Sequence, residues 1–145
     1  RGAIILPETM LYCTDDEIRE LEKKAKDKGA DGLVLVMDAA WPEDTKYINK
    51  TGAFIAHEGG KGSHTADIAI LMNKVAVMGI GAIKKFPSSI KSEGYITIGD
   101  KFLSEGEIIS INGVNGNIYE GIITLEDVSK AITLKIQHND SENSL

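Results

Sequence analysis

Residues 52–79 have the sequence GAFIAHEGGKGSHTADIAILMNKVAVMG. An apolar run at 52–56 has the length and composition of a buried strand, and a second such run follows at 75–78. Between them lie a glycine-rich segment and residues 65–73, whose apolar spacing is typical of a helix. The stretch therefore predicts a strand, a loop, a helix and a second strand. We expect four apolar side chains of that helix to face inward: Ala66, Ala69, Ile70 and Met72.

The N-terminal part predicts a β-α-β unit. Thr14 and Glu17 form a capping box, in which each residue's side chain satisfies the other's backbone amide, so a helix should begin there and run to about Lys28. Residues 32–37 (GLVLVM) follow as a buried strand. The strand before the helix is either residues 3–6 or residues 10–12.

The rest of the chain predicts short elements. Pro42 is followed by a short polar helix or turn within residues 43–50. Beyond residue 79 we expect strands at 95–98, 108–111 and 117–123, with a tight turn at Asn112-Gly-Val-Asn-Gly116. The polar residues 138–145 should fray. Together these elements predict an α/β fold.

Composition limits the classes of function. The chain has 145 residues, which suits one domain, and a formal net charge of −6, which gives no general attraction to nucleic acid or to an anionic membrane. The apolar runs are strand-length, far below the roughly 20 residues needed to span a bilayer. A single cysteine, Cys13, rules out an internal disulfide, so we expect a cytoplasmic protein. The first residue is Arg1, and we expect a domain of a longer chain or a processed product.

The glycine-rich segment, Gly59-Gly-Lys-Gly-Ser-His64, carries the chemistry. Loop amides and the start of the following helix form an anion site, and phosphate is the commonest biological anion at such sites. A histidine at the mouth of the helix can act as a nucleophile toward phosphorus. We therefore predict a catalytic His64 and a phosphoryl-binding group that consists of Gly59, Gly60, Lys61, Gly62, Ser63 and Thr65.

This segment has three other interpretations: a structural turn, a P-loop and a metal site. A glycine-rich stretch often marks only a tight strand-to-helix turn, and this alternative stays open on the residues alone. A P-loop requires Ser or Thr directly after its Gly-Lys pair, whereas Gly62 follows Lys61 here. His57 and His64 lack the spacing of a zinc-binding pair and no third ligand is evident, so we expect no metal site.

Residues 52–66 and 74–79, together with the upstream Ala40-Trp-Pro-Glu-Asp44, resemble the signature of the phosphoenolpyruvate-utilising enzymes' mobile domain. The family pattern is a strand, then Thr-x-x-Gly-Gly-x-Thr-Ser/Cys-His-Ala-Ala, a helix, and a strand that ends on Gly. Residues 103–121 resemble the family's last strands and turn, so the resemblance covers most of 30–123. The family includes pyruvate phosphate dikinases and phosphoenolpyruvate synthases.

The resemblance implies a swivelling β/β/α three-layer domain, which we expect to span residues 1–137. It also implies a phosphocarrier function, in which His64 carries a phosphoryl group between two remote sites. The chain would then be a dikinase-type phosphotransferase domain that is not active alone. We expect no cofactor in this domain. Mg²⁺ and ATP would bind to partner domains, one for the nucleotide and one for phosphoenolpyruvate or pyruvate, in the same chain or in another.

The chain differs from the family pattern at four positions. Ala56 and Gly62 replace the usual threonines, Ile70 replaces an arginine, and Asp67 stands where a small or apolar residue is usual. The three lost phosphate ligands, at positions 56, 62 and 70, favour the alternative of a non-catalytic relative in interdomain or subunit contacts, which resembles the C-terminal extension of some pyruvate kinases. The retained glycines at 59 and 60, with Ser63 and His64, oppose it. A third alternative is a sugar- or anion-binding swivelling domain.

Overall fold

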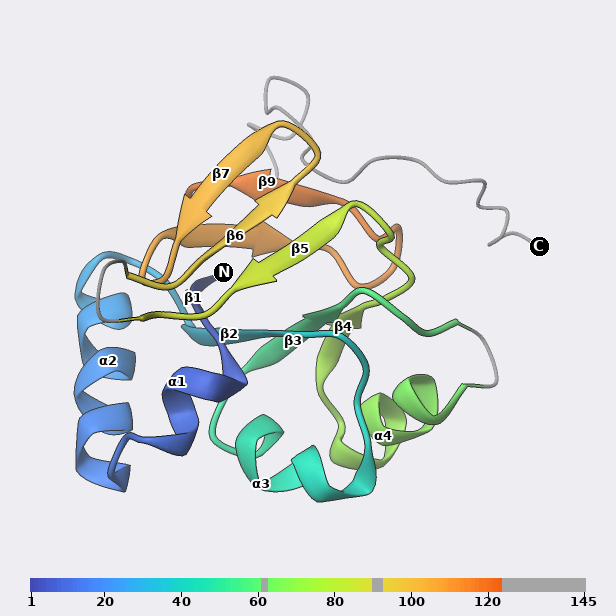
Figure 1. The fold of residues 1–145 in the computed structure, drawn as a ribbon, viewed down its shortest axis with the longest axis horizontal. Helices are drawn as coiled ribbons and strands as arrows, with labels where there is room; N and C mark the ends of the chain where they lie inside the picture. The colour runs from blue at the N-terminus through green and yellow to red at the C-terminus, as the bar shows by residue number, and fades with distance from the viewer. Residues whose placement is uncertain (61–62, 90–92, 124–145) are drawn as a thin grey trace.

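A computed structural model describes residues 1–60, 63–89 and 93–123 (Figure 1). In chain order the elements are β1 (Gly2–Ile5), α1 (Pro7–Leu11), α2 (Asp15–Asp27), β2 (Gly32–Met37), a 3-10 helix η1 (Pro42–Asp44), α3 (Thr45–Ile48), β3 (Ala53–Ala56), α4 (His64–Met72), β4 (Val75–Val77), β5 (Ile83–Phe86), β6 (Tyr95–Ile98), β7 (Lys101–Ser104), β8 (Ile108–Ile111) and β9 (Ile118–Glu120).

The strands form two sheets. The larger sheet has the order β4-β3-β2-β1-β8-β9, and its first four strands are parallel. Strand β8 pairs antiparallel with β1, and β9 pairs antiparallel with β8. The smaller sheet is antiparallel, in the order β5-β6-β7. This mixture of helices, a parallel core and an antiparallel sheet confirms the α/β prediction.

Alternating side chains of the central strands pack into two separate cores, because successive residues of a strand point to opposite faces. One face contacts the helices, in a core that includes Ile5, Leu35, Met37 and Phe54 from the strands and Ile68 from α4. The other face packs against the antiparallel sheet, in a core that includes Ile4, Val34 and Ile55 from the central strands and Ile96 and Leu103 from the antiparallel sheet. Figure 1 shows the result, with the antiparallel sheet on one side of β1–β4 and the helices on the other. The fold therefore has three layers.

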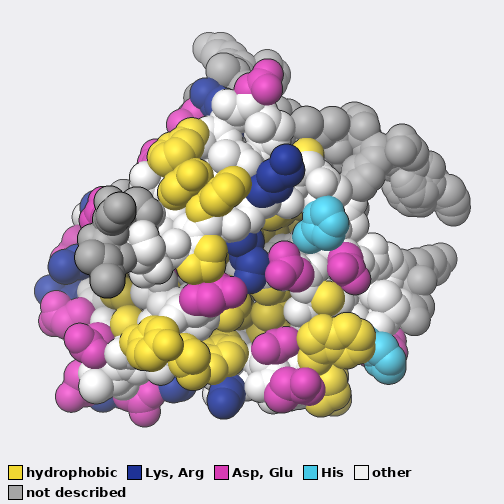
Figure 2. All heavy atoms as spheres, in the orientation of Figure 1, with side chains coloured by type: hydrophobic (Ala, Val, Ile, Leu, Met, Phe, Trp, Pro, Cys, Tyr) yellow, Lys and Arg dark blue, Asp and Glu magenta, His cyan; other side chains and the backbone are white. Residues whose placement is uncertain are grey.

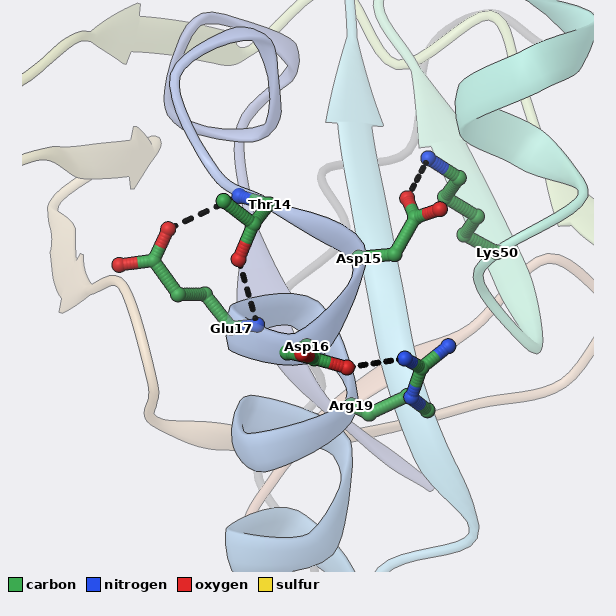
Figure 3. Close-up of polar contacts among 6 residues, drawn as sticks. All are labelled: Thr14, Asp15, Asp16, Glu17, Arg19 and Lys50. Carbon is green, nitrogen blue, oxygen red and sulfur yellow. Dashed lines mark hydrogen bonds and ion pairs between the residues drawn. The ribbon is translucent and has the colours of Figure 1, made fainter.

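The N-terminal unit confirms the prediction of β-α-β. Of the two possible first strands, β1 at Gly2–Ile5 forms, whereas Met10 lies in helix α1. At the start of α2, the Thr14 amide donates to the Glu17 carboxylate at 2.8 Å and the Glu17 amide donates to the Thr14 hydroxyl at 3.1 Å (Figure 3). The predicted capping box is present.

Helix α2 is also tied to the segment that precedes β3. The Lys50 ammonium donates to the Asp15 carboxylate at 2.6 Å, across 35 residues of sequence (Figure 3). This hydrogen bond, followed by the charge of Lys50, lowers the pKa of Asp15 below its ordinary value. Both side chains are substantially exposed, so the ion pair positions the two segments rather than adding much to stability.

In helix α4, one of the predicted side-chain orientations is wrong. Ala69 is buried and Met72 packs partly against the core, as expected, but the Ile70 side chain is 78% exposed. With 3.6 residues per turn, burial of positions 65 and 69 brings 68 and 72 to the same face and turns 70 outward. Ile68, which the prediction omitted, is buried instead.

The antiparallel sheet contains two strands, β5 and β7, that the sequence did not predict. Strand β5 carries two lysines and β7 carries one, and each strand has only one buried residue, Ile83 in β5 and Leu103 in β7. On the outer face, the Tyr95 ring stacks on Phe86 at 4.6 Å and on Phe102 at 4.2 Å between centroids. Figure 2 shows hydrophobic side chains gathered over this sheet. Cross-strand stacking of this kind stabilises a small sheet.

The C-terminal hairpin confirms the predicted turn. The Asn112 amide donates to the Asn117 carbonyl at 2.9 Å, and the Gly116 amide donates to the Asn112 carbonyl at 2.8 Å, between β8 and β9. The expected strand at 117–123 is shorter, at Ile118–Glu120. Residues 138–145, for which we predicted fraying, lie outside the described residues, and so does the predicted domain boundary at 137.

Candidate functional site

The site lies at the carboxyl ends of the parallel strands β2 and β3. The chain continues from β3 with the His57 amide, which donates to the Met37 carbonyl at 3.0 Å, and the Glu58 amide, which donates to the Asp38 carbonyl at 2.7 Å. This pairing extends β3 up to the glycines, and α4 begins at His64. Ligands of open α/β sheets usually bind at this edge, where loops and helix N-termini meet.

Ser63 caps helix α4. Its hydroxyl oxygen accepts hydrogen bonds from the Ala66 amide at 3.1 Å and the Gly60 amide at 3.0 Å. The loop is thereby folded onto the start of the helix, and His64 becomes the first helical residue. The Gly60 amide, which we expected to face a phosphoryl group, is directed to Ser63 in this structure.

Position 59 requires a glycine, because the backbone there approaches neighbouring side chains closely. Its φ is +127°, and a Cβ at this position would lie 3.1 Å from the Cβ atoms of both Met78 and Thr65. Gly79 is similarly placed, with φ +74° and the Gly59 carbonyl oxygen 2.9 Å from an added Cβ. The loops after β3 and β4 therefore touch at two glycines. Gly60 differs, because no described atom lies within 4 Å of a Cβ there.

Gly59→Ala should destabilise the protein by at least about 1 kcal/mol, because alanine would combine a strained positive φ with close contacts. Gly60→Ala is the matched control and should change the free energy of unfolding by less than about 0.5 kcal/mol. Urea denaturation of the three proteins measures both effects. Equal stability of the two variants would contradict this assignment of Gly59.

Thr65 joins the helix to the segment after β2. It is buried, and its hydroxyl oxygen accepts a hydrogen bond from the Ala40 amide at 3.1 Å. The same segment brings the Trp41 ring to the His64 ring, with 5.6 Å between centroids and an interplanar angle of 45°. Sequence reasoning gave Trp41 no role at the site, although the stretch from Ala40 to Asp44 had indicated the family resemblance.

A hollow of about 270 Å³ opens beside these residues, lined by Ala39, Ala40, Trp41, Glu58, Gly59, Ser63, His64, Thr65 and Asp67. His64 is exposed to it, as are the carboxylates Glu58 and Asp67. No lysine or arginine is among the described residues that line the hollow. The electrostatic environment of His64 in the described part of the chain is therefore acidic.

The structure describes some of the predicted site residues and leaves two of them outside the described ranges. Gly59, Ser63, His64 and Thr65 all line the hollow, and Gly60 bonds to Ser63 just behind it. Lys61 and Gly62 lie outside the described residues. Among the described residues, the amides of His64 and Thr65 have no hydrogen-bond partner, so the first turn of α4 offers donors toward an anion.

The described residues contain no group of three or more His, Cys, Asp or Glu side chains arranged to hold a metal ion. No described helix is long and apolar enough to cross a membrane.

The fold and the site define a three-layer α/β domain with a histidine at the start of a helix behind a glycine loop. Comparison with known proteins identifies the family: residues 29–116 match the PEP-utilising enzyme, mobile domain, and the chain belongs to this family. Curated relatives include pyruvate, phosphate dikinases from Clostridium symbiosum (32% identical over 82% of this chain) and Giardia intestinalis (32% over 72%). The chain spans only 13% and 11% of these relatives' lengths.

Proposed function

We propose that this chain is the phosphocarrier domain of a phosphoenolpyruvate-utilising phosphotransferase, with His64 as the residue that carries the phosphoryl group. The observation that carries the proposal is the position of His64. It is the first residue of α4, exposed at a hollow beside the glycine loop, in a chain of the mobile-domain family. The single cysteine fits a cytoplasmic setting.

The chemistry is two successive phosphoryl transfers. In the first, an unprotonated imidazole nitrogen of His64 attacks the donor phosphorus, a P–N bond forms, and the P–O bond to the donor breaks with its electron pair going to the leaving oxygen. In the second, an acceptor oxygen attacks and the P–N bond breaks, which returns the imidazole. The described residues contribute the nucleophile and the amides at the start of α4. We place the donor and acceptor sites, with ATP, Mg²⁺ and phosphoenolpyruvate or pyruvate, on partner domains, so the isolated domain would not turn over substrates.

The test is to locate the phosphate. The protein is isolated from its own cells under alkaline conditions, which preserve phosphohistidine, and its peptides are mapped by mass spectrometry. A phosphate on His64 that is stable in base and labile in acid is the expected result. The proposal would be overturned if His64 carries no phosphate in cells and gains none in cell extract that is supplied with phosphoenolpyruvate or with ATP and Mg²⁺.

Ile70→Arg should raise the rate at which His64 is phosphorylated by the small donor phosphoramidate. Helical side chains tilt toward the N-terminus, so an arginine at 70 would extend along α4 toward His64 and offer paired donors to the phosphoryl group. Because position 70 is exposed, we expect a gain on the order of three- to tenfold. The control is Ile70→Gln, which has similar length without charge. Equal rates for the two variants would contradict this prediction.

One observation favours the alternative of a non-catalytic relative in interdomain or subunit contacts. The described lining of the hollow has two carboxylates, Glu58 and Asp67, and no cationic side chain, which opposes a phosphoryl group. Under this alternative His64 stays unmodified in the mapping experiment above. Under the phosphocarrier function, the positive charge for the phosphoryl group comes from Lys61, which lies outside the described residues, from a partner, or from both.

A further inference from the structure

The backbone holds Trp41 in place within the segment that follows β2. The Trp41 amide donates a hydrogen bond to the Asp44 carboxylate at 2.9 Å, and the Trp41 carbonyl accepts one from the Asp44 amide at 2.8 Å. The preceding residue, Ala40, donates its amide to the hydroxyl of the buried Thr65 at 3.1 Å. Pro42 follows and restricts Trp41 to the extended conformation that it has, with φ −119° and ψ 162°. The start of the indole side chain is therefore fixed relative to the first turn of α4.

The indole ring packs on the ring of His64 and not in the protein interior. Trp41 is 48% exposed and is a member of neither hydrophobic core in the described part of the chain. Its ring lies 5.6 Å from the His64 ring between centroids, at an interplanar angle of 45°. Both side chains line the same hollow. The packing of this tryptophan therefore shapes the surroundings of the histidine.

No polar contact fixes the imidazole of His64 in the described part of the chain. Neither of its ring nitrogens takes part in a hydrogen bond or an ion pair with residues 1–60, 63–89 or 93–123, although Glu58 and Asp67 line the same hollow. An exposed imidazole without such a partner can rotate, which exchanges the positions of its two nitrogens. The Trp41 ring restricts this rotation, because paired rings favour a limited set of relative orientations.

We propose that Trp41 is a positioning residue, which holds the His64 imidazole so that one of its two nitrogens faces the hollow and receives the phosphoryl group. This inference rests on the proposed function. The two nitrogens are distinct, because the nitrogen that attacks must be unprotonated while the other holds the proton. A ring held in one orientation presents the same nitrogen in every cycle, whereas a freely rotating ring presents either.

Phosphoramidate probes this orientation without a partner protein. One imidazole nitrogen attacks the phosphorus and a P–N bond forms, while the bond from phosphorus to the protonated amino group breaks and ammonia leaves with its electron pair. The proton of the imidazole stays on the other nitrogen. The product is one of two phosphohistidine isomers. Their ratio early in the reaction reports which nitrogen was presented, and no docking surface contributes to it.

The experiment compares the full protein from strains whose gene encodes wild type, Trp41→Phe, Trp41→Ala or Phe102→Ala. Phe102→Ala is the matched control, since it removes an exposed aromatic ring (58%) from the outer face of the antiparallel sheet. Existing phosphate is removed with hydroxylamine, and each protein reacts with phosphoramidate. The peptide that contains His64 is then isolated in base, and phosphorus NMR quantifies its two isomers. The synthetic peptide 59–68 gives the ratio for a freely rotating histidine.

Wild type and Phe102→Ala should favour one isomer by about two- to tenfold over the ratio in the peptide, which is the preference that one aromatic pair confers. Trp41→Ala should return to the ratio of the peptide, and Trp41→Phe, which keeps a ring, should retain most of the preference. If circular dichroism shows that Trp41→Ala does not fold, Trp41→Leu takes its place with the same expected ratio.

The role of Trp41 would be overturned by a wild-type ratio equal to that of the peptide, or by the same ratio in wild type and in the folded variant without a ring. A folded Trp41→Phe that has lost all preference would overturn it as well. If phosphate is found on His64 in cells, these outcomes leave the proposed function intact. If His64 carries no phosphate in cells or in extract, the proposed function fails, and the role of Trp41 in transfer fails with it.

Discussion

Replacing His64 with asparagine should remove the acid-labile phosphate, with transfer falling by at least about 10³-fold, because asparagine has no nitrogen nucleophile that can hold a phosphoryl group. The side chain of His64 is exposed, and the cap of α4 is supplied by Ser63, so the fold should persist. An unchanged urea midpoint, monitored by circular dichroism, would verify this. The measurement is incorporation of phosphate from a competent donor.

His57→Asn is the matched control for this prediction. His57 lies seven residues earlier, at the end of β3, and its Nδ1 is buried without a hydrogen-bond partner among the described residues. It is absent from the lining of the hollow. Transfer should therefore persist in His57→Asn. Phosphate that remains in His64→Asn and disappears in His57→Asn would show that the nucleophile has been misassigned.

Phe54→Ala should produce the largest loss of stability, about 3–5 kcal/mol, because truncating a buried aromatic residue leaves a cavity. Phe54 is fully buried in strand β3, in the core between the larger sheet and the helices. Since domains of this kind are stable by only about 5–15 kcal/mol, the variant should be close to unfolding at 37 °C. Urea denaturation monitored by circular dichroism measures the change.

Phe102→Ala is the control for Phe54→Ala, since it removes the same side chain from an exposed position. Phe102 is 58% exposed and stacks on Tyr95 alone among the aromatic pairs, so its loss should cost about 1 kcal/mol. A Phe102 variant that loses as much stability as the Phe54 variant would contradict the placement of Phe54 in the core and of Phe102 on the surface.

Much of the site's local structure could be predicted from the sequence, because it depends on neighbours in the chain. A strand, three glycines, a serine and a histidine before a helical apolar pattern indicate a strand-to-helix turn with a capped helix. The structure has these features in β3, Ser63 and α4. Phosphorylation of His64 and binding by the loop residues stay predictions.

Predictions failed where a choice depended on contacts between distant segments. The orientation of Ile70 could not be settled by its apolar character, since the face of α4 that packs on α3 and the core decides which residues turn inward. Strands β5 and β7 were missed because each buries a single residue, so neither has the apolar run that indicates a buried strand. Pairing with β6 makes them strands.

By itself the sequence determined the features whose signal, a motif or an apolar pattern, lies within a few residues. These are the capping box at Thr14, the buried strand Gly32–Met37, and the loop that ends in a histidine at a helix start. Only the tertiary structure decided what surrounds that histidine. The Trp41 ring and the Thr65–Ala40 hydrogen bond come to it from the segment after β2, because β2 and β3 are parallel neighbours whose carboxyl ends share one edge of the sheet. The exposure of Leu71 was likewise set by the packing of α4. A helix at the surface buries only the face that packs against the core, and Leu71 lies on another face.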